Sequence, residues 1–267
     1  MGLLKAKIGF GKAVKYKTWD FDELARPYFY KGGDSGCLLM HGFGGTPATM
    51  RHIADALVDA GCTVYAPLLR GHGTTLLDMN SCTWEDWLDD ARSAYDKLAS
   101  EGVKRIFLMG FSMGGVLMSL LAQERDCDGL VLMSAPLRVK QYIQRISKLH
   151  RVIPYAEIKS SKSGNRYLQS YSGIAVDKLR DLYTLTLKVR GGLYKITCPV
   201  LVLQSRFDNK VDLKSVNIIK HGVSCKDKKV VWLEKSPHGC VYGPEQDRVA
   251  RECVEFVQRL SNRDSSG

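Results

Sequence analysis

The sequence predicts an α/β protein with a mostly parallel, doubly wound sheet, and two observations carry this prediction. Short apolar runs that are typical of buried strands alternate along the chain with longer segments whose apolar residues keep helical spacing. The expected strand 106–109 also runs through a Gly-x-Ser-x-Gly sequence at 110–114 into an apolar helical segment. With 267 residues, of which 45% are apolar and 25% charged, the chain can bury one sizeable core.

The remaining elements follow in chain order. Thr46 and Pro47 are expected to begin the first helix, because Pro is favoured at the first helical position. Thr83 is expected to begin another helix, and a further amphipathic helix lies near the C-terminus. The expected strands are 37–40, 62–66, 106–109, 130–133, 199–204 and 229–234. The expected core stripes of these helices are Met50, Ile53, Ala54 and Leu57, then Trp84, Trp87, Leu88, Ala91, Tyr95 and Leu98, then Val249, Cys253, Phe256, Val257 and Leu260.

Ser112 is the candidate nucleophile, because Gly110 and Gly114 flank it between a buried strand and a helix. A turn this tight leaves no room for neighbouring side chains, and glycine meets that requirement. The Gly-x-Ser-x-Gly sequence alone is weak evidence, but in this context it indicates a nucleophile elbow. A serine hydroxyl is a poor nucleophile by itself, so the sequence should also supply a base, an acid and an oxyanion hole.

His238 is the candidate base, since proteins with this elbow carry the acid and then the histidine after the serine. It lies on the loop after the strand 229–234, at the edge where such a sheet presents its ligand site. The histidines at 41, 52 and 72 all precede Ser112. His150 lies in a basic stretch that predicts a surface helix, and His221 lies where a helix C-terminus is expected.

Asp208 is the candidate acid, because it lies on the loop that leaves the preceding strand, 199–204. From there its carboxylate can reach the far nitrogen of His238, fix the tautomer and stabilise the imidazolium. Asp212 is the competitor. It lies where a helix begins, so an N-cap role is the better interpretation for it.

The oxyanion hole needs two backbone N–H groups, and Met113 and Phe43 are the candidates. Met113 follows the nucleophile, and Phe43 lies in the Gly-rich loop after the strand 37–40. A Gly-rich loop before a helix can instead bind phosphate. Here no Lys-Ser/Thr pair follows the glycines, and the spacing of a dinucleotide fingerprint is missing.

Five segments of the chain together resemble the α/β-hydrolase superfamily. They are the His-Gly-Phe-Gly-Gly sequence from His41, the Arg-Gly-His-Gly sequence from Arg70, the elbow, and the loops of the candidate acid and base. The likeness is greatest to small bacterial carboxylesterases and monoacylglycerol lipases, and it covers about residues 28–260. It implies an α/β-hydrolase fold with eight strands or slightly fewer, helices on both faces, and a helical cap inserted after the sixth strand, 130–133. The expected division is a basic arm over 1–25, a core over 26–135 and 191–262, and the cap over 136–190.

The resemblance implies a serine hydrolase of carboxylic esters, acting on short- to medium-chain acyl esters or monoacylglycerols through an acyl-enzyme on Ser112, without metal or cofactor. A dehalogenase or epoxide hydrolase of this fold would need Asp at position 112. An aminopeptidase should offer cap carboxylates to a substrate ammonium, but Glu157 is the only acid between 138 and 166. A catalytically silent receptor for a small apolar signal is the alternative from another class.

Within the cap, a helical stripe that includes Tyr142, Ile143 and Ile146 is expected to line the acyl pocket or to pack against the core. The positive charge is concentrated in the cap and the arm: residues 138–166 carry eight Lys/Arg, and residues 1–17 carry five Lys. Signatures of RNA and single-strand binders are missing, so no nucleic-acid partner is expected. The charge is consistent with a solvated face or with weak association with anionic interfaces. The alternating arm could pack on the sheet edge or pair in a homodimer, and the sequence leaves this open.

The eight cysteines form no Cys-x-x-Cys pair and no cluster with histidine at the spacing of zinc ligands. They indicate free thiols rather than a zinc site or a disulfide framework, and a reducing, cytoplasmic location is expected. Cys240, two residues after His238, is expected to pack in the core. No apolar run is long enough for a transmembrane segment, and the N-terminus shows no secretory signal.

Overall fold

A seven-stranded sheet forms the centre of the molecule, and six of its strands run parallel. The computed structural model describes residues 22–148, 155–157, 165–171 and 173–262. The strand order is β1-β3-β2-β4-β5-β8-β9, with β1 antiparallel at one edge. The strands are β1 (Tyr28–Tyr30), β2 (Ser35–Met40), β3 (Thr63–Ala66), β4 (Arg105–Phe111), β5 (Gly129–Met133), β8 (Val200–Ser205) and β9 (Lys228–Leu233).

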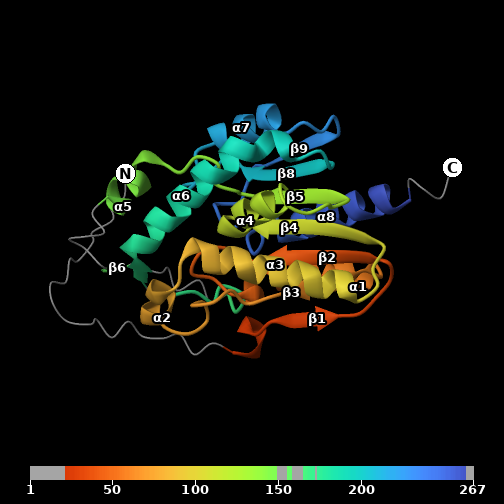
Figure 1. Ribbon diagram of the computed structural model, residues 1–267, viewed down its shortest axis with the longest axis horizontal. Coiled ribbons are helices and arrows are strands. Elements are labelled where there is room, and N and C mark those ends of the chain that lie inside the picture. Colours follow the sequence, from red (N-terminus) through yellow and green to blue (C-terminus); the bar gives the residue numbers. More distant parts are fainter. Residues whose placement is uncertain (1–21, 149–154, 158–164, 172, 263–267) are drawn as a thin grey trace.

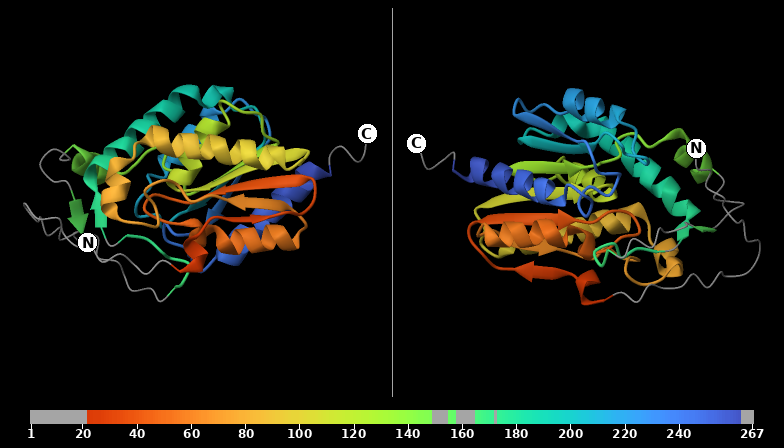
Figure 2. Two further views of the ribbon diagram at one scale, coloured as in Figure 1. Left: turned by 60° about the horizontal axis from the view of Figure 1, so that its bottom comes forward. Right: turned by 180° about the vertical axis from the view of Figure 1, so that it is seen from behind.

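Helices cover both faces of this sheet, which confirms the predicted doubly wound α/β class (Figure 1). The left view of Figure 2 shows the sheet between α1 and α8 on one side and α3 and α6 on the other. Because the strands are covered on both faces, their side chains alternate between two apolar cores. In β2, for example, Leu38 and Met40 belong to one core, and Cys37 and Leu39 to the other. The helices are α1 (Arg51–Asp59), α2 (Leu76–Ser81), α3 (Trp84–Ser100), α4 (Met113–Leu121), α5 (Gln141–Ser147), α6 (Val176–Gly192), α7 (Lys214–Gly222) and α8 (Gln246–Ser261).

Local sequence signals explain where several helices begin. Thr83 caps α3 through a reciprocal capping box with Asp86, as the predicted helix start requires. Pro47 lies at the first position of a short 3-10 turn, Pro47–Met50, which continues into α1. The stripes expected in α1 and α8 are buried throughout, and in α3 only Trp84 and Tyr95 stay partly exposed. Every expected strand is present to within a residue or two, whereas β1 was not predicted.

The chain between β5 and β8 forms the inserted segment that the sequence predicted as a cap. It differs from the expectation in two respects. Besides α5 and α6 it contains a two-stranded antiparallel sheet of β6 (Tyr155–Glu157) and β7 (Gly173–Ala175), so it is not purely helical. The strand before it, β5, is the fifth among the described residues and not the sixth. The arm over 1–25 lies almost wholly outside the described residues, and so does His150.

One buried ion pair anchors α6 to the core. Lys178, only 3% exposed, lies 2.7 Å from the Asp181 carboxylate and donates to the carbonyl oxygen of Cys82 at 2.6 Å. Burying a lysine is costly unless its charge is paired and its donors are used, and both conditions hold here. This contact fixes α6 next to the residues that connect α2 and α3.

Candidate active site

Ser112 lies in the sharp turn between β4 and α4, with φ 51° and ψ −121°. A non-glycine residue with positive φ is strained, and such strain concentrates at functional sites. The two glycines make the turn possible. A Cβ on Gly110 would collide with the backbone of Gly114, and a Cβ on Gly114 would collide with the carbonyl oxygen of Met40 in β2. The serine side chain therefore projects beyond the carboxyl edge of the sheet.

The structure brings Ser112, His238 and Asp208 together in one hydrogen-bonded chain. The hydroxyl of Ser112 lies 3.0 Å from Nε2 of His238, and Nδ1 of His238 lies 2.9 Å from Oδ2 of Asp208. A carboxylate can only accept, so Nδ1 carries the proton and Nε2 is free to accept from the serine. His238 and Asp208 are both buried, whereas Ser112 is partly exposed. The nucleophile thus lies between a buried base and solvent.

The carboxylate of Asp208 is held by several donors besides His238. Oδ1 accepts from the backbone N–H groups of Lys210 at 2.9 Å and Val211 at 2.8 Å, and Oδ2 accepts from the side-chain amide of Gln204 at 3.1 Å. Gln204 was not among the site residues predicted from the sequence. The signal was present, because it is a polar residue at the end of an otherwise apolar strand.

Burial and charge set the protonation states of this pair. Burial alone raises the pKa of Asp208, but the hydrogen bond and charge of His238 and the two backbone donors outweigh it and hold the pKa below the ordinary value. Burial lowers the pKa of His238 more than Asp208 raises it, and the charge of Lys210 lowers it further. At neutral pH the site therefore holds an ionised carboxylate and a neutral imidazole.

Asp212, the competing acid, has a different role. Its carboxylate accepts from the backbone N–H of Lys214 at 3.0 Å, next to the start of α7, and lies 3.0 Å from Arg138. The N-cap position of α7 is held by Leu213 and no side chain caps the helix, so Asp212 lies just before the helix without the N-cap role that the sequence predicted. The imidazole of His221, at the end of α7, is bonded to the carbonyl oxygen of Asn217.

The two oxyanion candidates lie at the start of α4 and on the loop after β2, which meet at Ser112. Met113 is the first residue of α4, and among the described residues no acceptor is found for its N–H or for that of Phe43. The loop of Phe43 approaches the serine closely, because a Cβ on Gly42 would lie 3.2 Å from the Ser112 Cβ. Two unpaired donors beside a nucleophile are what an oxyanion hole requires.

A cluster of rings holds the Phe43 loop in place. The ring of Phe43 packs edge-on against Trp87 and His72, at 6.0 and 6.5 Å between centroids, and His72 packs against His41 at 5.0 Å. The Nε2 of His41 accepts from the backbone N–H of Leu69 at 3.2 Å. Burial lowers the pKa of His41 to about 3 and that of His72 to about 4, so both stay neutral.

Tyr171 joins the cap to this loop, a role that the sequence did not reveal. Its hydroxyl donates to the carbonyl oxygen of Gly71 at 2.6 Å and accepts from the N–H of Thr74 at 3.1 Å. Its backbone N–H donates to the carbonyl oxygen of Gly44 at 3.3 Å. The side chain of Tyr171 is buried in these contacts.

The candidate acyl-pocket residues lie on α5, which packs against α6. Ile143 and Ile146 are half-buried, and Tyr142 is 40% exposed with its hydroxyl donating to the carbonyl oxygen of Asn209, beside the acid loop. Lys140 donates to the carbonyl oxygen of Asp208 at 2.8 Å, so the start of the cap also contacts that loop. The assignment of an acyl pocket to these residues stays a prediction.

Within the described part of the chain, no three His, Cys, Asp or Glu side chains gather as a metal site would require. The same residues include no helix with the length and apolar character needed to cross a bilayer. Cys240 is buried in the core, with its sulfur 3.6 Å from the hydroxyl of Ser134.

Comparison with known proteins places this geometry in context. The family model described as "Serine aminopeptidase, S33" matches residues 34–245. A carboxylesterase from Bacillus subtilis is 32% identical over 238 residues, which is 88% of this chain and 97% of that protein. A thermostable monoacylglycerol lipase from a Bacillus species is also 32% identical, over 88% of this chain and 95% of that protein. Among solved structures, one from a study of the metagenome-derived lipolytic enzymes LipS and LipT superposes with a TM-score of 0.83 and 28% identity, covering 89% of this chain and 98% of that one.

Proposed function

Because the chain belongs to the serine hydrolase family described as serine aminopeptidase S33, we propose that it is a serine hydrolase that cleaves carboxylic esters through an acyl-enzyme on Ser112. The observation that carries the proposal is the unbroken chain of hydrogen bonds from Asp208 through His238 to the Ser112 hydroxyl. The names of the two Bacillus relatives support an ester as the substrate.

In the proposed reaction His238 takes the hydroxyl proton as Ser112 attacks the ester carbonyl carbon. The N–H groups of Phe43 and Met113 hold the oxyanion that develops, and the charge of Asp208 stabilises the imidazolium. His238 then gives its proton to the leaving alcohol, which leaves the acyl group on the serine. Water attacks the acyl-enzyme by the same steps, which releases the carboxylic acid product and regenerates the Ser112 hydroxyl.

The described cap gives little support to an aminopeptidase. Such an enzyme needs a free carboxylate to hold the substrate ammonium. In α6, Asp181 lies 2.7 Å from Lys178, and Asp177 lies 3.3 Å from Arg180. Both carboxylates are already paired, which favours an uncharged substrate such as a short- to medium-chain ester or a monoacylglycerol.

Turnover of matched chromogenic substrates tests the proposal. We expect p-nitrophenyl acetate, butyrate and octanoate to be hydrolysed, amino-acid p-nitroanilides to be hydrolysed at least about 100-fold more slowly, and Ser112→Ala to abolish the ester activity. Ester hydrolysis that persists in the alanine variant would refute the role of Ser112. Faster cleavage of the anilides would make the enzyme a peptidase.

A weak association with anionic interfaces, through the basic cap, is a second proposal. Phe207 is 65% exposed on the loop that carries Asp208, and the exposed Tyr142 and Arg145 lie on α5. An apolar ring beside cations is the combination that binds anionic lipid surfaces. Co-sedimentation with phosphatidylglycerol vesicles, lost at high salt and absent with phosphatidylcholine, is the expected result, and equal binding to both lipids would contradict it.

We further propose a cytoplasmic location, supported by the eight cysteines that are all free in the structure. The homodimer expectation rests on the arm, which lies outside the described residues. Sedimentation velocity of the full chain, compared with a chain that begins at residue 22, decides whether the arm joins two copies.

A further inference from the structure

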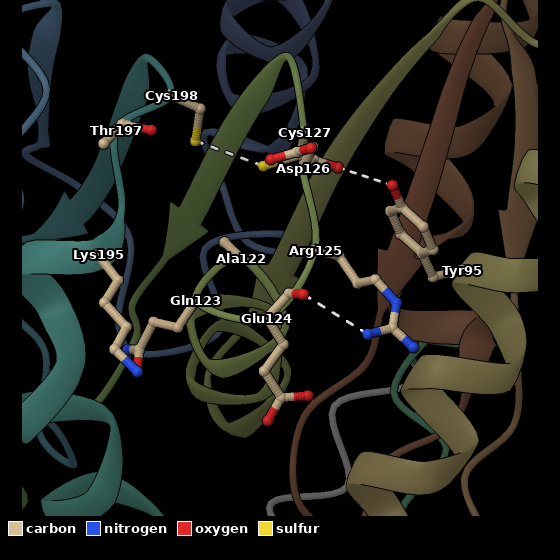
Figure 3. Close-up of a pocket in the computed structure, with 10 residues that line it drawn as sticks. All are labelled: Tyr95, Ala122, Gln123, Glu124, Arg125, Asp126, Cys127, Lys195, Thr197 and Cys198. Carbon is tan, nitrogen blue, oxygen red and sulfur yellow. Dashed lines mark hydrogen bonds between the residues drawn. The ribbon is translucent and has the colours of Figure 1, made fainter.

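Two cysteines lie in contact at the amino-terminal edge of the sheet, which is opposite the edge that carries the catalytic loops. Cys127 precedes β5 and Cys198 precedes β8, which is the neighbouring parallel strand. Their sulfur atoms are 3.4 Å apart, with the Cys127 thiol donating to the Cys198 sulfur (Figure 3). The two residues are 71 positions apart in the sequence, so the fold alone brings them together.

The hydrogen bond makes the two thiols unequal. It lowers the pKa of Cys198, although burial opposes this, and it raises the pKa of Cys127. A thiolate is the attacking species in thiol–disulfide exchange. Cys198 is therefore the thiol that reacts first, and Cys127 is placed to react second.

Both cysteines lie at the surface of the protein. The two cysteines are partly exposed and line a surface hollow of about 390 Å³ together with Tyr95, Gln123 and Lys195 (Figure 3). The chain offers an internal comparison, because the thiols of Cys37 and Cys62 also perturb one another, but these residues are only 0% and 5% exposed. Of these two interacting pairs of thiols, Cys127 and Cys198 lie at the surface, whereas Cys37 and Cys62 are buried.

We propose that Cys127 and Cys198 form a redox-active dithiol, which low-molecular-weight disulfides of the glutathione type oxidise to an intramolecular disulfide. The Cys198 thiolate attacks one sulfur of the small disulfide, forms a mixed disulfide and releases the first small thiolate. The Cys127 thiol then loses its proton and attacks the Cys198 sulfur. That step breaks the mixed bond and releases the second small thiolate. The two protein protons end on the two small thiols, so two electrons pass from the protein to the small disulfide.

The disulfide would close a loop that contains β5 and the whole cap, including α6. A crosslink stabilises a fold mainly by restricting the unfolded chain, and the effect grows with loop length. A loop of about 70 residues is long by this measure. The catalytic residues follow the carboxyl ends of β4, β8 and β9, whereas the two cysteines precede the amino ends of β5 and β8. Oxidation should therefore strengthen the attachment of the cap without blocking Ser112. The proposal is independent of the substrate.

The test incubates the reduced full-length protein with oxidised glutathione, alkylates the remaining thiols in denaturant and maps the peptides by mass spectrometry. We expect one disulfide, between Cys127 and Cys198, with Cys37 and Cys62 alkylated. We also expect the melting temperature to rise by about 5 °C or more on oxidation and to return with dithiothreitol. Cys198→Ser should lose this shift, and Cys127→Ser should stop at a glutathione adduct on Cys198. Cys82→Ser is the matched control, since Cys82 is a partly exposed cysteine outside the pair, and it should keep the shift.

Peptide mapping of the unaltered protein decides the matter even where a variant fails to fold. A stable glutathione adduct on Cys198 with Cys127 still free would overturn the proposal, because the second thiol would then not resolve the first. Oxidation of Cys37 and Cys62 at the same rate would also overturn it, since access would not be what distinguishes the pairs.

Discussion

Replacing Asp208 by Asn tests the acid assignment, because Asp212 offers a matched control four positions away. In the fold Asp208 accepts from His238, from two backbone N–H groups and from Gln204. An amide at this position has one acceptor oxygen, and its NH2 group must face one of these donors. If the oxygen keeps the backbone donors, the NH2 group faces His238 and favours the wrong tautomer.

The expected loss in kcat for Asp208→Asn is about 10⁴-fold, which corresponds to about 5.5 kcal/mol of transition-state stabilisation. The unmatched donor should also reduce the free energy of unfolding by about 1–3 kcal/mol. Asp212→Asn removes only a partly exposed contact to Arg138, so it should cost less than about 1 kcal/mol and leave kcat within about twofold.

The assay is p-nitrophenyl butyrate hydrolysis across pH, with urea unfolding to confirm that each variant is folded. The charge of Asp208 raises the pKa of His238. Removal of this charge should therefore shift the acidic limb of the variant's pH–activity profile to lower pH. Equal losses in the two variants, or a limb that shifts to higher pH, would refute the assignment of the acid.

Three further predictions concern the nucleophile, the cap and acid stability. Ser112→Ala and His238→Ala should each lower kcat by about 10⁶-fold and the double variant by little more, whereas multiplied losses would show that the two residues act separately. Ile146→Asp should lower kcat/KM for octanoate esters by about 10- to 1000-fold and for acetate by less than about tenfold, because each buried methylene contributes about 0.8 kcal/mol; equal losses at unchanged melting temperature would place the acyl pocket elsewhere. Burial lowers the pKa of His72 from 6.5 to about 4, so its stabilising effect is complete above pH 6.5 and is lost as the pH falls toward 4, because only the unfolded chain takes up the proton in that window. The stability difference between the unaltered protein and His72→Gln, from urea unfolding, should therefore shrink by about 3 kcal/mol from pH 7 to pH 4, and a constant difference would mean that His72 is protonated in the fold.

The sequence predicted the features that depend on short patterns. The elbow needs glycines at fixed offsets from Ser112, and the loops of Asp208 and His238 each follow an apolar strand, so local spacing was enough to find them. The apolar periods of α1 and α8 predicted their buried faces for the same reason.

Apart from Gln204, which had a local signal, the functional features that were missed depend on contacts between distant segments. Tyr171 contacts Gly44 and Gly71 only because the cap returns over the core, and no pattern around position 171 indicates this. The hairpin of β6 and β7 pairs two three-residue strands, which are too short to show a period. The Cys127–Cys198 contact depends on which strands are neighbours, and the sequence does not give strand order.

The contacts of Tyr171 have a consequence for redesigning this enzyme. A graft that exchanged the cap to change substrate range would also remove the hydrogen bonds to Gly44 and Gly71, and with them a support of the loop that carries Phe43. Chimeras in which the exchanged segment includes Tyr171 should therefore lose turnover on all esters to the same extent. A graft that keeps Tyr171 and replaces only the segment before it leaves that support intact, so a change in selectivity can be separated from damage to the catalytic centre.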